Sequence, residues 1–183
     1  MGVVVEEAHP DLSEAHDTFQ VMRGVAFATS YAGLLERHQD KMKPEVVWNI
    51  EKGLSYSMAD LVRAENDRAA MFRRTNLFFD TYDLLLCPAT IVAAYPATER
   101  YVKECAGHTF TNYVEWLAIA YAITLTASPA LSLPCGFTSD GRPVGLQIVG
   151  RLRSEGRVLA GARALEQVLD LRSITPIDPR PPS

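Results

Sequence analysis

Cysteine is scarce in this sequence, and long apolar runs are missing. The 183 residues include three cysteines, Cys87, Cys105 and Cys135. An odd, widely spaced set predicts neither a disulfide framework nor a zinc motif, and it is typical of reduced thiols in the cytoplasm. No apolar run approaches the ~20 residues that cross a membrane, and residues 1–12 lack the basic start of a secretory signal. We therefore expect a cytoplasmic protein with no membrane partner.

Clustered positive charge is also missing. The net charge is −4, and the longest basic run is the pair Arg73 and Arg74. Phosphate backbones are bound by clustered lysine and arginine, so we expect no nucleic-acid partner. With 48% hydrophobic and 22% charged residues the composition is that of an ordinary soluble domain. We expect residues 1–183 to form a single segment.

Signals for intrinsic chemistry are few. The sequence has no Gly-x-Ser-x-Gly elbow, no Ser-x-x-Lys motif and no glycine- and serine-rich loop. Cys135 is a candidate nucleophile, but none of the four histidines has a recognisable spacing to it, and a small core residue is the favoured alternative. Cys105 and His108 are too few for a zinc site, and no phosphate-binding loop is present. The sequence therefore assigns no catalytic residue, no cofactor site and no metal site.

Helix and strand signals alternate along the chain. Ser57 with Asp60 forms a capping box before a helix, and Asp11 with Glu14 gives a similar start to an earlier helix that Gly33 breaks. Apolar periodicity and turn residues predict the remaining elements: a strand at 2–6, a short helix from residue 43 that ends near Gly53, a strand at 83–89 buried on both faces, a strand pair at 130–134 and 144–150, a helix capped by Ser154 and ending near Leu169, and an extended proline-rich tail at 173–183. This order predicts an α/β fold with a layered mixed sheet flanked by helices.

One stretch resembles a known family. Residues 128–150 read SPALSLPCGFTSDGRPVGLQIVG, which is similar to the C-terminal hallmark of the amidase signature hydrolases. Three positions depart from that pattern, namely Ala127, Ser128 and Arg142. The matching positions are Pro129, Ala130, Ser132, Pro134, Gly136, Gly141, Pro143, Val144, Gly145 and Gln147.

The resemblance extends, more weakly, over nearly the whole chain and implies the C-terminal part of the amidase signature fold. In that family the nucleophilic serine, a second serine on a cis peptide and a lysine lie in a glycine- and serine-rich region N-terminal to anything in this sequence. No catalytic residue can therefore be transferred to this chain. The resemblance implies a C-terminal part that is inactive alone.

The segment before the hallmark, residues 111–127, resembles the part of the family that lines the acyl side of the substrate pocket. On this basis Tyr113, Trp116 and Leu117 are candidate substrate-binding residues. Leu117 stands where the glutamine-using members of the family have an aspartate, which argues against glutamine as substrate. Tyr113 and Trp116 favour an apolar or aromatic acyl group, and packing of the two rings against a core is an equally open alternative.

Two functions follow as hypotheses. The first is the C-terminal part of an amidase-type hydrolase that acts on carboxamide C–N bonds other than peptide bonds, with a small-molecule amide as substrate in the complete enzyme only. The second is a non-catalytic structural or interaction module. In either case we expect a homo-oligomer or pairing with a missing N-terminal half, because a sheet without its neighbouring strands exposes edges.

Overall fold

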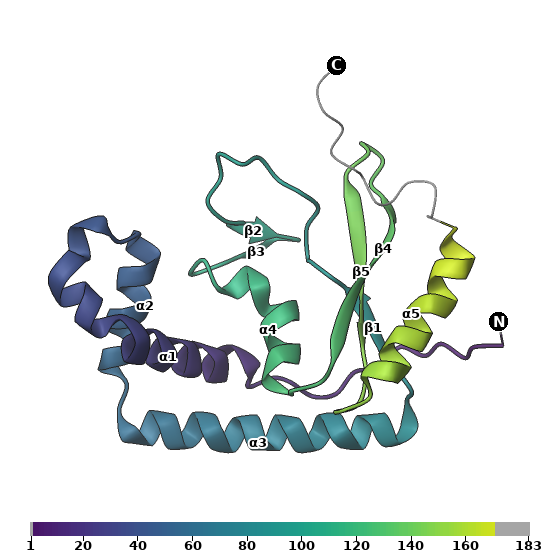
Figure 1. The fold of residues 1–183 in the computed structure, drawn as a ribbon, viewed down its shortest axis with the longest axis horizontal. Coiled ribbons are helices and arrows are strands. Elements are labelled where there is room, and N and C mark those ends of the chain that lie inside the picture. Colours follow the sequence, from purple (N-terminus) through teal and green to yellow (C-terminus); the bar gives the residue numbers. More distant parts are fainter. Residues whose placement is uncertain (1, 171–183) are drawn as a thin grey trace. The chain divides into compact units, whose positions relative to one another are not determined.

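The computed structural model describes residues 2–170, and they form two compact units. Among the described residues, the first unit comprises residues 2–75 with Thr124–Thr126, and the second comprises Asn76–Ile123 with residues 127–170. Figure 1 shows helices and strands, which confirms the predicted α/β class. The sheet was predicted to be mixed, but every strand pair among the described residues is antiparallel. The elements are α1 (Ala15–His38), η1 (Gln39–Lys41), α2 (Pro44–Ser55), α3 (Met58–Thr81), β1 (Leu85–Pro88), β2 (Glu104–Cys105), β3 (His108–Thr109), η2 (Glu115–Leu117), α4 (Ala118–Leu125), β4 (Ala130–Phe137), β5 (Pro143–Val149) and α5 (Glu155–Leu169).

Helices α1 and α2 of the first unit cross at two glycines. A Cβ atom placed on Gly53 would lie 1.9 Å from the carbonyl oxygen of Gly24, so only glycine permits this approach. Ile50 and Met71 are fully buried in this unit. Burial of such side chains supplies most of the free energy that holds amphipathic helices together.

The helix starts differ in how well local sequence predicts them. Ser57 and Asp60 form the predicted capping box, since the Asp60 N–H donates to Ser57 Oγ at 3.2 Å and the Ser57 N–H donates to Asp60 Oδ2 at 2.9 Å. The predicted helix forms as α1, but its predicted start and break were wrong: the helix begins at Ala15, its N-cap Glu14 makes no side-chain cap, and the helix continues through Gly33. Asp11 instead accepts a hydrogen bond from the Ser13 N–H at 3.0 Å.

The main sheet of the second unit has the strand order β1-β5-β4. The predicted pair at 130–150 is confirmed as the antiparallel hairpin of β4 and β5. Helix α5 packs against this hairpin and covers one face of it. That face is a leucine-rich core whose buried members are Leu133, Ile148, Val158 and Ala162, with Leu84, Leu131, Leu146, Leu165 and Leu169 packed around them.

Strand β1 forms, but its predicted burial on both faces was wrong. It pairs only with β5 among the described strands, and its residues alternate between half-buried and exposed. The run of leucines suits a central strand, yet β1 has a paired neighbour on one side only. The burial of an apolar run is therefore decided by its neighbours and not by its composition.

A tight turn at residues 138–142 connects the hairpin strands. The Thr138 N–H donates to the Arg142 carbonyl at 2.8 Å, and the Gly141 N–H donates to the Thr138 carbonyl at 2.9 Å. Gly141 has φ +84°, a conformation that glycine adopts without strain. The predicted Asp-Gly turn is confirmed.

Three further predictions concern the chain ends. Residues 2–6 form no strand in the structure, because no described strand pairs with them. Ser154 precedes α5 as predicted, but its hydroxyl donates to the Arg151 carbonyl and makes no cap to the helix. The predicted extended tail at 173–183 lies outside the described residues.

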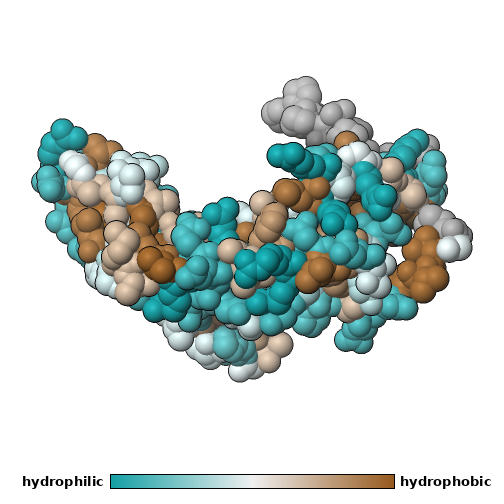
Figure 2. Space-filling model, turned by 90° about the horizontal axis from the view of Figure 1, so that it is seen from below, coloured by the Kyte–Doolittle hydropathy of each residue, from teal (hydrophilic) through white to brown (hydrophobic). Residues whose placement is uncertain are grey.

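The surface mixes polar and apolar side chains. Figure 2 shows apolar residues as separate groups among polar ones. The most exposed large apolar side chains are Val4, Val5, Met58 and Val3, at 83%, 81%, 74% and 69%. Across residues 2–170, no helix combines the length and the apolar character that a membrane span requires.

Candidate functional site

Polar contacts fix the turn that carries the candidate substrate-binding residues. The Glu115 carboxylate accepts a hydrogen bond from the Thr111 N–H at 2.6 Å and another from the Thr111 hydroxyl. The Asn112 side-chain oxygen accepts the Val114 N–H at 2.9 Å. Such side-chain-to-backbone bonds define a turn that leads into a helix. The segment therefore has a fixed conformation up to the first turn of α4.

Tyr113 and Trp116 each contact another aromatic ring. The Tyr113 ring lies edge-on to Tyr101, with centroids 6.3 Å apart, and the Trp116 ring lies edge-on to Tyr95, with centroids 5.8 Å apart. Edge-to-face pairs of this kind add roughly 0.5–1.5 kcal/mol beyond the burial of area. Tyr113, Trp116 and Leu117 are all half-buried. Each therefore combines a packing role with a part that remains accessible.

A cavity of about 560 Å³ lies in the loop that supplies the two tyrosine partners. Tyr95 lines the cavity, and its ring also contacts Trp116. The three candidate residues Tyr113, Trp116 and Leu117 do not line the cavity. Sequence reasoning missed Tyr95, because nothing local marks a loop tyrosine as the partner of a tryptophan 21 positions away. The lining residues are Val92, Ala93, Tyr95, Glu99, Val102, Lys103, Glu104 and Arg142.

The cavity wall carries both signs of charge. Arg142, one of the positions that depart from the hallmark, donates to the Ala94 carbonyl and forms an ion pair with Asp140 at 2.8 Å. The Arg142 guanidinium and the Thr138 hydroxyl hold the pKa of the Asp140 carboxyl below its usual value. Arg142 therefore ties the hairpin turn to the loop that forms the cavity.

Gln147 connects the hallmark to the substrate-side segment. Its amide Nε2 donates to the Ile119 carbonyl at 3.2 Å and to Cys87 Sγ at 3.2 Å. Ile119 lies in the first turn of α4, and Cys87 lies on β1. One side chain on the central strand thus binds both an edge strand and the helix that follows Trp116. The hallmark match identified Gln147 but not these contacts.

Cys135 does not stand out as a reactive group. It is half-buried, and its Sγ lies 3.6 Å from the Val144 carbonyl oxygen of the neighbouring strand. That contact stays within the hairpin backbone, next to the β-bulge between Pro134 and Gly136. Within the described part of the chain, no three His, Cys, Asp or Glu side chains gather as a metal site would require.

Comparison with known proteins gives consistent matches. The family model "Amidase" matches residues 2–159. An acylamidase of Rhodococcus erythropolis is 33% identical over 183 residues, which is 97% of this chain and 38% of that protein. A putative amidase of Mycobacterium tuberculosis, AmiA2, is 32% identical over 147 residues, which is 77% of this chain and 30% of that protein.

Structural comparison agrees with these matches. A crystal structure of an amidase superposes with a TM-score of 0.78 and 25% identity, covering 86% of this chain and 36% of the other. The chain thus spans little more than a third of the acylamidase and amidase that it matches. The family model spans most of the described residues, hallmark hairpin included. This chain belongs to the amidase family.

Proposed function

We propose that this chain is the C-terminal part of an amidase-type hydrolase that acts on carboxamide C–N bonds other than peptide bonds. The observation that carries the proposal is the family match over residues 2–159. The chain corresponds to 38% of the acylamidase, and we assign the complete activity to the whole enzyme. The same proposal places the protein in the cytoplasm, in line with its free cysteines at positions 87, 105 and 135.

The chemistry of the complete enzyme requires residues outside this sequence. In serine acyl transfer the hydroxyl oxygen attacks the amide carbon, the C–N bond breaks as the amine leaves with a proton, and water then hydrolyses the ester. No residue of this chain is assigned to those steps, and we expect the chain alone to be inactive. Its contribution is to bind and orient the acyl group.

The acyl-side wall is assigned to Tyr113, Trp116 and Leu117. Their half-buried side chains combine a fixed position with accessible apolar surface. Tyr101 and Tyr95 hold the two rings edge-on, while Gln147 fixes the start of α4. Leu117 adds an aliphatic side chain without charge. A carboxamide with an apolar or aromatic acyl group fits this wall better than glutamine does.

The first test measures hydrolysis of aryl and aliphatic amides by the purified chain. It repeats the measurement after the chain is mixed with the part of the Rhodococcus erythropolis acylamidase that this chain does not match. We expect no turnover by the chain alone and turnover by the mixture. Turnover by the chain alone, well above buffer, would contradict the assignment of catalysis to another part.

A second test uses the same mixture to examine Leu117. Leu117→Asp introduces a charge into the proposed wall and should lower kcat/KM for apolar amides by about tenfold or more. The matched control is Leu159→Asp, at a leucine of α5 that is 59% exposed, and it should leave kcat/KM unchanged. Equal effects of the two substitutions would remove Leu117 from the wall.

A second candidate function is a non-catalytic module that self-associates. Strand β4 favours it, because this eight-residue strand pairs only with β5 among the described strands and has one open edge. Sedimentation of the purified chain distinguishes the two functions. A clean monomer at every concentration contradicts self-association, whereas a stable dimer without amidase activity in any mixture favours the module.

A further inference from the structure

Residues 92–99 carry Tyr95 and have no regular secondary structure. Residues 96–99 are exposed, while Val92, Ala93 and Tyr95 are half-buried. Across residues 2–170, a single hydrogen bond joins this segment to a part of the chain distant in sequence: Arg142 Nη1 donates to the Ala94 carbonyl. A segment with few contacts opens at low free-energy cost, so the bond from Arg142 has a large share in fixing it.

The Arg142 side chain is itself held by the hairpin turn. The Asp140 carboxylate accepts a hydrogen bond from Arg142 Nε at 3.1 Å and pairs with Nη2 at 2.8 Å. The Thr138 hydroxyl accepts the Arg142 N–H at 2.9 Å, which fixes the backbone of the same residue. Because the guanidinium is planar, a carboxylate bound on one side leaves Nη1 directed elsewhere, and here Nη1 donates to the Ala94 carbonyl. The turn therefore presents Arg142 to the segment in a defined orientation.

The residue that follows Ala94 is the aromatic partner of Trp116. The Tyr95 ring meets the Trp116 ring edge-on, with centroids 5.8 Å apart and an angle of 87° between the planes. An edge-to-face pair has a preferred geometry, so each ring limits the orientation of the other. Displacement of the backbone at Ala94 would move the ring next to it. The hydrogen bond from Arg142 therefore bears on the orientation of Trp116.

We propose that Arg142 is a positioning residue that acts through Ala94 and Tyr95 to fix the Trp116 ring, and that it thereby sets which acyl groups the complete enzyme accepts. This inference rests on the proposed function, because Trp116 belongs to the proposed acyl wall. Arg142 departs from the hallmark pattern, so the hallmark itself does not supply this bond.

The expected effect is on selectivity between acyl groups. A ring held in one orientation offers a defined flat surface to an aromatic acyl group, and prior fixation of that ring lowers the entropic cost of binding. A small aliphatic acyl group makes few contacts with the same ring. Loss of Arg142 should therefore weaken binding of aromatic acyl groups and leave small ones unaffected.

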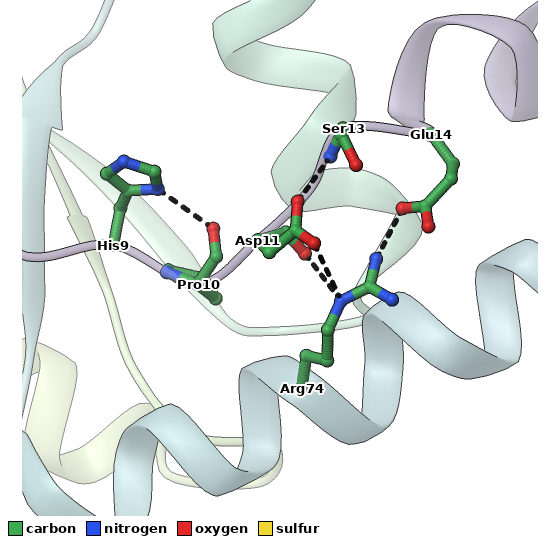
Figure 3. A network of polar contacts seen from close by, with 6 residues as sticks. All are labelled: His9, Pro10, Asp11, Ser13, Glu14 and Arg74. Atoms are coloured by element: carbon green, nitrogen blue, oxygen red, sulfur yellow. Dashed lines mark hydrogen bonds and ion pairs between the residues drawn. The ribbon is translucent and has the colours of Figure 1, made fainter.

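An arginine of the first unit provides a matched control. Arg74 donates from Nε to the Asp11 carbonyl at 2.9 Å and from Nη2 to the Glu14 carboxylate (Figure 3). Like Arg142, it joins a loop carbonyl to a carboxylate, but it binds the residues before α1 and not the segment of Tyr95. Replacement of either arginine by glutamine removes the same charge. A difference between the two variants therefore reports on the segment at 92–99.

The first experiment measures Trp116 in the chain alone. The sequence has two tryptophans, so Trp48→Phe leaves Trp116 as the only one. In this background Arg142→Gln should raise the constant for acrylamide quenching of Trp116 fluorescence by about twofold, because the ring becomes more accessible when Tyr95 moves. Arg74→Gln should leave the constant unchanged. Unchanged quenching in Arg142→Gln, or an equal rise in Arg74→Gln, would overturn the proposal.

A double-mutant cycle tests whether Arg142 acts through Tyr95. Tyr95→Leu removes the ring that contacts Trp116 and should raise the quenching constant as Arg142→Gln does. Addition of Arg142→Gln to Tyr95→Leu should then cause little further change, because both substitutions remove the same contact. Full additivity of the two changes would overturn the proposal.

The activity test uses the mixture with the unmatched part of the Rhodococcus erythropolis acylamidase. Arg142→Gln should raise KM for amides with an aromatic acyl group by about tenfold and keep kcat within about twofold, as expected when only binding is lost. Both constants for small aliphatic amides should stay near wild type. An equal loss for the two substrate classes would overturn the role in selectivity.

The two kinds of readout separate this inference from the proposed function. If no mixture hydrolyses any amide, the proposed function fails, while the quenching results still decide whether Arg142 positions Trp116. Hydrolysis by the mixture with wild-type quenching and wild-type selectivity in Arg142→Gln contradicts this inference alone.

Discussion

Residues 3–5 are three valines, and residues 84–87 are three leucines and a cysteine. Valine favours strands more than leucine does, yet only the second segment forms one. Leu85–Pro88 is β1 and pairs with β5, whereas Val3–Val5 remains exposed. A neighbouring strand decides the outcome, because backbone groups of a strand are satisfied only across a ladder. The comparison separates strand preference, which is local, from strand formation, which needs a partner.

The largest expected effect lies at the centre of the paired region. Ile148 is fully buried and pairs with Leu86 of β1 and Leu131 of β4. Ile148→Ala should lower the free energy of unfolding by about 2–5 kcal/mol, from lost burial and the cavity left behind. Urea denaturation measures this. The control, Val168→Ala at a residue 60% exposed on α5, should change little. A loss below about 1 kcal/mol for Ile148→Ala would show that burial in the paired region contributes less than the comparison requires.

A smaller effect is expected at Gln147. Gln147→Leu removes the donor to the Ile119 carbonyl and to Cys87 Sγ, so the free energy of unfolding should fall by about 1–3 kcal/mol. Amide exchange should also rise in α4, whose first turn loses its tie to the sheet. Gln167→Leu, at an exposed glutamine of α5, is the matched control. Identical exchange in α4 for both variants would mean that Gln147 does not hold the helix.

A weaker, pH-dependent effect is expected at the hairpin turn. The folded-state pKa of Asp140 lies below the ordinary 3.8 because Arg142 and Thr138 bind the charged carboxylate. A lowered folded-state pKa stabilises the fold above the unfolded pKa, and this contribution is lost as pH falls through the folded value. Asp140→Asn should therefore flatten the dependence of unfolding free energy on pH below about pH 4. Urea titrations at several acidic pH values measure the slope, and an unchanged slope would contradict this role.

The smallest effect is expected in the unpaired segment. Val4→Ala should change the free energy of unfolding of the isolated chain by no more than about 0.5 kcal/mol, because Val4 is 83% exposed. The same urea experiment measures it beside Ile148→Ala. A loss above about 1 kcal/mol would mean that the valines pack within the chain, and the contrast between the two segments would then fail.

Local signals predicted several elements correctly. Ser57 and Asp60 form their capping box because both partners lie within one helical turn. The hairpin of β4 and β5 follows from alternating apolar residues around a turn in which Gly141 has positive φ. The hallmark in the same residues also pointed to the amidase family, which the family match confirms. All of these depend on residues close together in sequence.

Long-range contacts were not predictable in the same way. Three contacts each join residues more than 20 positions apart: Gly53 packs against Gly24, Arg74 binds Asp11, and the Trp116 ring contacts the Tyr95 ring. The assignment of Tyr113, Trp116 and Leu117 to a substrate wall came from a resemblance and stays a prediction. No local sequence pattern distinguishes a tyrosine whose ring packs against a tryptophan from a tyrosine that faces solvent.

The sequence alone determined the family, the α/β class, most helices and the hallmark hairpin, because those depend on periodicity, caps, turns and a contiguous motif. Within residues 2–170, the tertiary structure alone decided that β1 pairs on one side only, that Gln147 ties α4 to the sheet, and that Val3–Val5 stays exposed. The physical reason is that burial and hydrogen bonding between distant segments depend on which surfaces meet. A sequence encodes the preference of each segment for helix or strand, and only the assembled fold supplies the neighbouring segment that it packs or pairs with.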